Sequence, residues 1–141
     1  MGLTMHVTRV VRQETVDGWT NYARIVDAVL VSIAVLLALC CWITAAADVC
    51  QYQPIVETMN RLGVSLRALP VLAVLKIAGG LGLIIGQWNE KLLTAASVSL
   101  AAYFAAAIVV HLRVRDSFRS VAPAGALMLI SVVVFADSFT K

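Results

Sequence analysis

Residues 68–86 read ALPVLAVLKIAGGLGLIIG and contain a single acidic or basic residue, Lys76. About 20 mostly apolar residues suffice for a helix to cross the hydrocarbon core of a bilayer. Pro70 falls in the first turn, where a helix tolerates the missing amide proton. Gly82 and Gly86 have the Gly-x-x-x-Gly spacing at which two membrane helices approach closely. The stretch therefore predicts a spanning helix that packs against a neighbour.

Three further apolar segments, at about 25–47, 92–112 and 121–136, are also long enough to span. The sequence thus predicts an all-α polytopic membrane protein. We expect a polar N-terminal segment, residues 1–24, and a four-transmembrane-helix bundle, residues 25–141, with both termini on one side. Five basic residues fall on each side of the bilayer, so the positive-inside rule gives no orientation.

The composition indicates that lipid is the solvent of most side chains. Of the 141 residues, 61% are hydrophobic and 13% are charged, against roughly 25% charged in soluble domains. A soluble chain of this length could not bury so much apolar surface. The net charge of +3 is too small and too dispersed for a nucleic-acid surface. We expect the lipid bilayer as the main partner, with other membrane proteins or further copies of the chain.

The polar stretch between the first two spans, residues 48–67, predicts a short amphipathic helix. Pro54 suits the first position of a helix. One helical face is formed by four apolar residues, Ile55, Met59, Leu62 and Leu66. Glu57 stands on another face, four residues before Arg61, and is either an acid–base group over the bundle or a partner of that arginine. We expect this helix to lie on the bundle or in the membrane interface.

Lys76 is the residue that most strongly indicates a functional site. Insertion scales give ~2.5–3.5 kcal/mol for a lysine at the centre of a spanning helix. Its neighbours one turn later are Gly79 and Gly80, so we expect Lys76 to face the bundle interior. It either binds an anionic or quinone-like ligand, takes part in proton transfer, or is structural and pairs or snorkels. The acidic residues available for pairing are Asp27, Asp48 and Asp137.

His111 ends the third span, where a histidine can bind metal, relay protons or simply form hydrogen bonds. The chain has only one other histidine, so we predict no metal site. No nucleophile–base arrangement, P-loop or dinucleotide fingerprint is present, and the catalytic residues stay unknown. The candidate ligand-binding or functional residues are Lys76, His111, Glu57, Arg113 and Asp116, and the candidate helix-packing residues are Gly79, Gly80, Gly82 and Gly86.

The three cysteines do not have the spacing of a disulfide or thiol-redox set. Cys40 and Cys41 are adjacent in an apolar run, Cys50 follows nine residues later, and no Cys-x-x-Cys occurs. Adjacent side chains on a helix point about 100° apart. We expect small buried apolar side chains and one stray thiol.

Several stretches together resemble the DoxX-like family of membrane proteins. They are MNRLGV at 59–64, LPVLAVLKIAGG at 69–80, Gly86, YFAAA at 103–107 and HLRVRD at 111–116. The resemblance covers about 50–120 and implies a four-helix membrane bundle, often bacterial. The family takes its name from a subunit associated with thiosulfate:quinone oxidoreduction, and related members are linked to membrane redox complexes. Its recurring lysine and histidine correspond to Lys76 and His111, as shared positions of unknown role.

Three classes of function agree with these observations. The first is a non-catalytic accessory or scaffold component of a membrane complex, which the small size and the missing catalytic set favour. The second is the membrane subunit of a quinone-linked oxidoreductase system, which the resemblance implies. The third is a small-molecule transporter or channel that works as an oligomer. We predict no cofactor, with a quinone only under the second class, and a location in the bacterial cell membrane.

Overall fold

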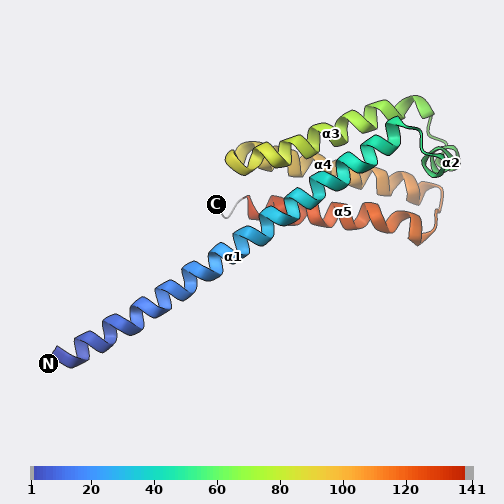
Figure 1. The fold of residues 1–141 in the computed structure, drawn as a ribbon. Coiled ribbons are helices and arrows are strands. Elements are labelled where there is room, and N and C mark those ends of the chain that lie inside the picture. Colours follow the sequence, from blue (N-terminus) through green and yellow to red (C-terminus); the bar gives the residue numbers. More distant parts are fainter. Residues whose placement is uncertain (1, 139–141) are drawn as a thin grey trace. The chain divides into compact units, whose positions relative to one another are not determined.

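The computed structural model describes the backbone of residues 2–138 and the side chains of residues 18–138. It contains five α-helices and no strand within this range (Figure 1). The helices are α1 (Gly2–Val49), α2 (Gln53–Leu62), α3 (Leu69–Ile85), α4 (Glu90–Arg113) and α5 (Phe118–Asp137), with the 3₁₀ helices η1 (Leu66–Ala68) and η2 (Gly86–Trp88) on either side of α3.

Four stretches of these helices are long and apolar enough to cross a membrane: Gly18–Val49, Leu66–Trp88, Glu90–Arg113 and Phe118–Asp137. The short helix α2 lies between the first and the second. The predicted all-α, four-span architecture with an amphipathic helix after the first span is therefore confirmed, and the chain is an integral membrane protein.

The chain divides into two compact units, residues 1–32 and residues 33–141. The first unit is helical from residue 2 onward, and its side chains Trp19 and Tyr22 are exposed. The second unit holds the rest of α1, the helices α2–α5, and the hydrophobic core. The candidate site lies wholly in this second unit.

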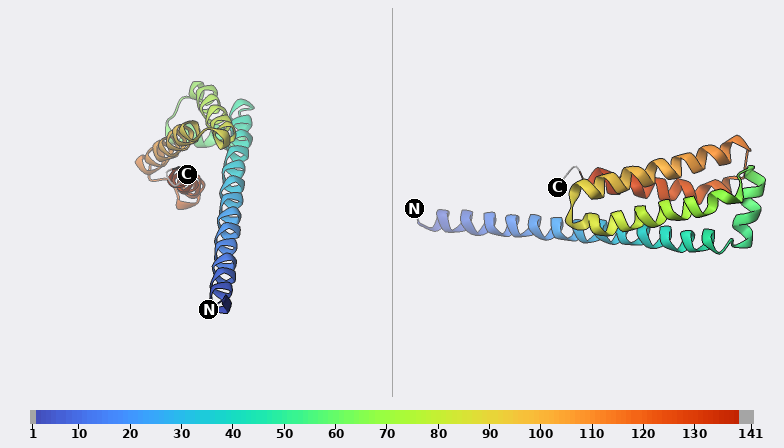
Figure 2. Two further views of the ribbon diagram at one scale, coloured as in Figure 1. Left: turned by 90° about the vertical axis from the view of Figure 1, so that its left-hand side faces the viewer. Right: turned by 90° about the horizontal axis from the view of Figure 1, so that it is seen from above.

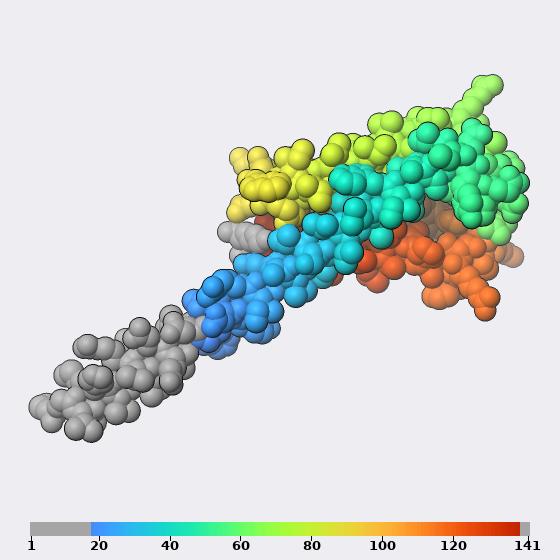
Figure 3. Space-filling model, in the orientation of Figure 1, coloured from blue at the N-terminus to red at the C-terminus, as the bar shows by residue number. Residues whose placement is uncertain are grey.

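Within residues 33–141, α4 is the central helix of the bundle. Both α3 and α5 pack along it (Figure 2), and Figure 3 shows the final turns of α1 between α3 and α5 on one face. The buried core consists of small or aliphatic side chains and one phenylalanine: Ala34, Leu37, Ala38, Cys41, Leu83, Leu93, Ala96, Leu100, Phe104 and Val134. Most other large apolar side chains are exposed, as expected where lipid solvates them.

The glycines of α3 and η2 allow this segment to lie close to α4. A Cβ built on Gly82 would lie 2.7 Å from the Cβ of Ala96, and one on Gly86 would lie 2.6 Å from the Cα of Leu93. A Cβ on Gly79 would likewise meet a side chain of α4. Such separations are too short for real carbon atoms, and the atoms met at Gly82 and Gly86 cannot move aside by a change of rotamer, so only glycine permits this packing there.

Gly80 faces α1 instead, because it is one residue and therefore about 100° further round the helix than Gly79. A Cβ on Gly80 would lie 2.5 Å from Nε1 of the Trp42 indole. That nitrogen donates a hydrogen bond of 3.3 Å to the carbonyl of Ile77. The pair of adjacent glycines thus lets α3 approach α4 and α1 at the same level.

Labelling of introduced cysteines tests the four-span topology. Helix α4 has 24 residues and is about 36 Å long at 1.5 Å per residue, so Gln87 before it and Ser117 after it belong on opposite sides of the membrane. We expect single cysteines at these positions, in a variant without the three native cysteines, to react with an impermeant maleimide from opposite faces. Labelling of both from the same face would contradict the topology.

Candidate functional site

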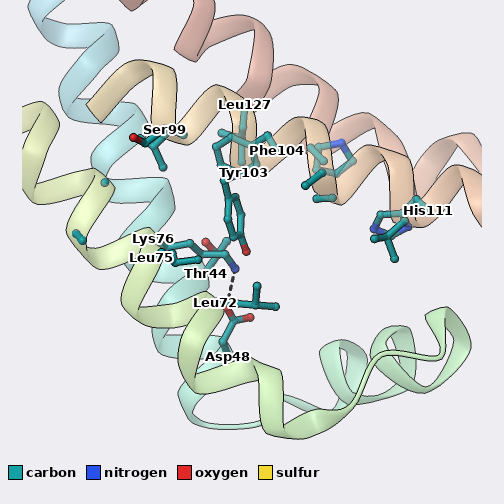
Figure 4. Close-up of a pocket in the computed structure, with 18 of the residues that line it drawn as sticks. Thr44, Asp48, Leu72, Leu75, Lys76, Ser99, Tyr103, Phe104, His111 and Leu127 are labelled. Atoms are coloured by element: carbon teal, nitrogen blue, oxygen red, sulfur yellow. Dashed lines mark hydrogen bonds and ion pairs between the residues drawn. The ribbon is translucent and has the colours of Figure 1, made fainter. Parts of the chain in front are cut away.

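The lysine of the second span is paired with an acid of the first. Lys76 Nζ donates a hydrogen bond of 2.6 Å to Asp48 Oδ2 near the end of α1 (Figure 4). The two side chains are 12% and 3% exposed. A buried charge is tolerated when a partner of opposite charge satisfies it. Of the acids that the sequence offered as partners, Asp48 is the one that the fold brings to Lys76.

Tyr103 of α4 forms the third part of this cluster. Lys76 Nζ lies 5.9 Å from the centroid of its ring, near the outer limit of a cation–π contact. Figure 4 shows the Tyr103 hydroxyl directed towards Lys76. Phe104 supports the ring from the side in an edge-to-face contact, with the centroids 5.2 Å apart. Three spanning segments therefore contribute one polar side chain each: Asp48, Lys76 and Tyr103.

This cluster lies on the wall of a cavity of about 1010 Å³. Helices α1 to α5 all contribute to its lining, which is mainly apolar and includes Met59, Leu72, Leu100, Phe104 and Leu127. Asp48 and Lys76 are the only oppositely charged pair among the lining residues. The volume is at the upper end of the range for small-molecule sites, ~300–1,000 Å³. The lining is mainly apolar with a few polar groups, as in most such sites.

A second polar cluster joins α2 to the turn between α4 and α5. His111 also lines the cavity, and its Nδ1 lies 2.8 Å from Asp116 Oδ2. Arg61 Nη2 of α2 lies 3.3 Å from the same oxygen, and Asp116 Oδ1 accepts the backbone N–H of Ser117. The hydrogen bond with His111 is the largest cause that holds the pKa of Asp116 below its usual value, and the Ser117 N–H and the Arg61 charge lower it further.

The lowered pKa of Asp116 predicts that the contact between α2 and the bundle is sensitive to acid. A carboxyl whose pKa is lower in the folded than in the unfolded chain stabilises the fold above the unfolded pKa, about 3.9, and loses that effect as the pH falls through the folded pKa. We expect the Tm of the wild type in detergent to fall on acidification by more than the Tm of Asp116→Asn. Glu57→Gln, which removes an exposed acid, should follow the wild type. Equal acid-induced losses in wild type and Asp116→Asn would contradict this account.

The other two charged candidates lie away from the cavity lining. Glu57 is exposed on α2 and accepts a hydrogen bond of 3.4 Å from Gln53 Nε2. Arg61, its alternative partner in the sequence, pairs with Asp116 instead. Arg113 is exposed at the end of α4. Neither Glu57 nor Arg113 is among the lining residues, so the structure brings together Lys76, Asp48 and Tyr103 at one place and His111 with Asp116 at another.

Sequence reasoning gave Asp48 and Tyr103 no role of their own. Asp48 was one of three acids that Lys76 could reach, and its signal was its position at the end of an apolar run. Tyr103 stands eight residues, about two helical turns, before His111 in α4, and both residues line the cavity. A polar aromatic at this spacing from a candidate residue is the signal that could have identified it.

The three cysteines are free. Cys41 is buried in the core as expected, but Cys40 and Cys50 are exposed, so the expectation of two buried cysteines and one stray thiol is wrong for Cys40. It is exposed because the helix turns by about 100° between adjacent residues. Among the described residues, no group of three histidine, cysteine or acidic side chains is arranged to hold a metal ion.

Four apolar helices around a cavity with one buried ion pair define a small polytopic membrane protein. The family model described as the DoxX-like family matches residues 32–134. The chain therefore belongs to the DoxX-like family. Searches among curated proteins and among solved structures gave no match.

Proposed function

We propose that this protein is a non-catalytic component of a membrane complex and holds a lipid-soluble, amphipathic small molecule in its intramembrane cavity. The observation that carries the proposal is the cavity of about 1010 Å³ with the Lys76–Asp48 pair on an otherwise mainly apolar wall. The chain belongs to the DoxX-like family. Because members of that family are often bacterial, this membership supports a place in the bacterial cell membrane.

The lining of the cavity supports an amphipathic ligand. Apolar side chains from α2, α3, α4 and α5 suit a hydrocarbon chain or a ring system. A few polar groups at fixed positions, here Lys76, Asp48 and Tyr103, suit a head group and would set its orientation. A molecule that is apolar at one end and polar at the other would satisfy both parts of the wall.

The bonding of the charged side chains supports a binding role over a catalytic one. Lys76 forms an ion pair with Asp48. His111 is bonded to Asp116, which also contacts Arg61. A general base needs a substrate proton within hydrogen-bond reach, and a nucleophile needs an adjacent base. These groups instead join helices to one another, as expected of a scaffold around a bound molecule.

A quinone-linked redox subunit is the second candidate function. The observation that favours it is the position of two hydrogen-bond donors, the Lys76 ammonium and the Tyr103 hydroxyl, on one wall of an apolar cavity. A quinone has carbonyl oxygens that accept such bonds and a long apolar tail that the remaining wall would cover. Under this candidate the quinone is the bound molecule, and its electrons come from a partner protein.

Purification in mild detergent, followed by native mass spectrometry, optical spectroscopy and organic extraction, tests the proposal. We expect the wild type to retain a small amphipathic molecule. Ala107→Phe fills part of the cavity from α4 and should lose it, whereas Ala102→Phe adds the same ring on the exposed side of that helix and should retain it. Equal content in all three proteins would contradict a cavity site, and an extracted quinone would favour the second candidate.

A further inference from the structure

We infer that Asp48 occupies the place beside Lys76 that an anionic head group would otherwise take, so that the cavity selects uncharged amphiphiles with a hydrogen-bond acceptor over acids of equal chain length. The inference rests on the proposed function and names the ligand class of the same site. It makes Asp48 the residue that determines specificity.

The charges of the cavity wall are already balanced. Lys76 and Asp48 are in direct contact at 2.6 Å, with side chains 12% and 3% exposed. The other lining side chain that can become a cation, His111, is engaged by Asp116, and Arg61 contacts that same carboxylate from α2. A ligand carboxylate would therefore enter as an uncompensated charge close to Asp48, at a cost in desolvation and in repulsion between like charges.

Hydrogen-bond donors are nevertheless available to a neutral head group. A lysine ammonium carries three protons, and the hydrogen bonds found among residues 18–138 give one of them to Asp48. The Tyr103 hydroxyl is directed to the same place (Figure 4). A carbonyl or hydroxyl oxygen can accept from these donors without adding a charge. The apolar remainder of the wall then covers the chain of the ligand.

Competition between two matched probes tests the inference on the full-length protein in detergent. The probes are a long-chain alcohol and the fatty acid of the same chain length, measured by native mass spectrometry at a pH where the free acid is ionised. We expect the wild type to bind the alcohol about tenfold or more tightly than the acid. In Asp48→Asn, the ammonium loses its internal counter-ion, and we expect the preference to reverse in favour of the acid.

Two further variants keep the result interpretable. Glu57→Gln removes an acid outside the cavity lining and should keep the wild-type preference. Asp48→Asn combined with Lys76→Met removes both charges, and it should still bind the alcohol and discriminate against the acid. If Asp48→Asn does not fold, the preference of the wild type decides the question, and equal binding of the alcohol and the acid overturns the inference.

Several outcomes would overturn the inference. A wild type that binds the acid as tightly as the alcohol, with binding lost in Ala107→Phe, would overturn the inference and leave the proposed function standing. An unchanged preference in a folded Asp48→Asn would do the same. Binding of neither probe to the wild type, or equal binding to Ala107→Phe, would overturn both.

Discussion

Lys76→Met is expected to lower the free energy of unfolding by about 3 kcal/mol, the lower end of the range for removing one partner of a buried ion pair. The reason is the carboxylate of Asp48, which is 3% exposed and would lose its cationic partner. The lower end is expected because the pair lines a cavity, where the stranded carboxylate can be partly solvated. Chemical unfolding in mild detergent, followed by tryptophan fluorescence, measures the change.

Two controls separate the ion pair from other effects of the substitution. Lys91→Met makes the same change at an exposed lysine in the first turn of α4, and its stability should stay close to that of the wild type. Lys76→Met combined with Asp48→Asn removes the stranded charge and should recover most of the lost stability. A stable single variant would mean that Asp48 is solvated without its partner, and the pair would then contribute little to folding.

Gly86→Ala is expected to destabilise the bundle by about 1–3 kcal/mol, the usual cost of overpacking. The added Cβ would lie 2.6 Å from the Cα and 2.7 Å from the N of Leu93. These are backbone atoms, which cannot move aside by a change of rotamer, so the helices α3 and α4 would have to separate. The backbone of Gly86 has φ −61° and ψ −18°, which alanine adopts freely, so the effect is one of packing alone.

Gly125→Ala is the matched control for this prediction. Gly125 also lies in a spanning helix, α5, but a Cβ there would meet nothing within 4 Å. Alanine is preferred to glycine in helices by up to about 1 kcal/mol, so this variant should be as stable as the wild type or more stable. The Tm values of both variants in the same detergent test the pair. Equal losses would show that the substitution in any helix, and not the contact with Leu93, is responsible.

The spans could be predicted because their signal is local. An apolar run of sufficient length must form hydrogen bonds within itself inside the bilayer, and the helix achieves this without any partner. The amphipathic helix α2 was predictable for the same reason, since Pro54 at its start and the apolar spacing after it are features of neighbouring residues. The structure adds only the exact ends, such as Gly63 in the left-handed conformation after Leu62.

The direction in which the site residues face could be predicted in part. The glycines one turn from Lys76 indicated the side of α3 that meets other helices, and the structure places Lys76 on the cavity wall. Glu57 and Arg113, like His111, were predicted to lie near a membrane boundary, yet unlike His111 they lie outside the cavity lining. One turn of helix decides whether such a side chain faces the cavity or the outside, and the amino-acid type does not reveal that rotation.

The sequence by itself determined that this chain is a helical membrane protein, because hydrophobicity and length act along the chain and need no knowledge of distant residues. Only the tertiary structure decided that Asp48, one of three acids considered as partners, neutralises Lys76 at a separation of 28 residues. It likewise decided that Asp116 binds both His111 and Arg61, and that His111 lines the same cavity as the Lys76–Asp48 pair. Pairings of this kind depend on the rotation and depth of each helix in the bundle, which packing against other helices sets.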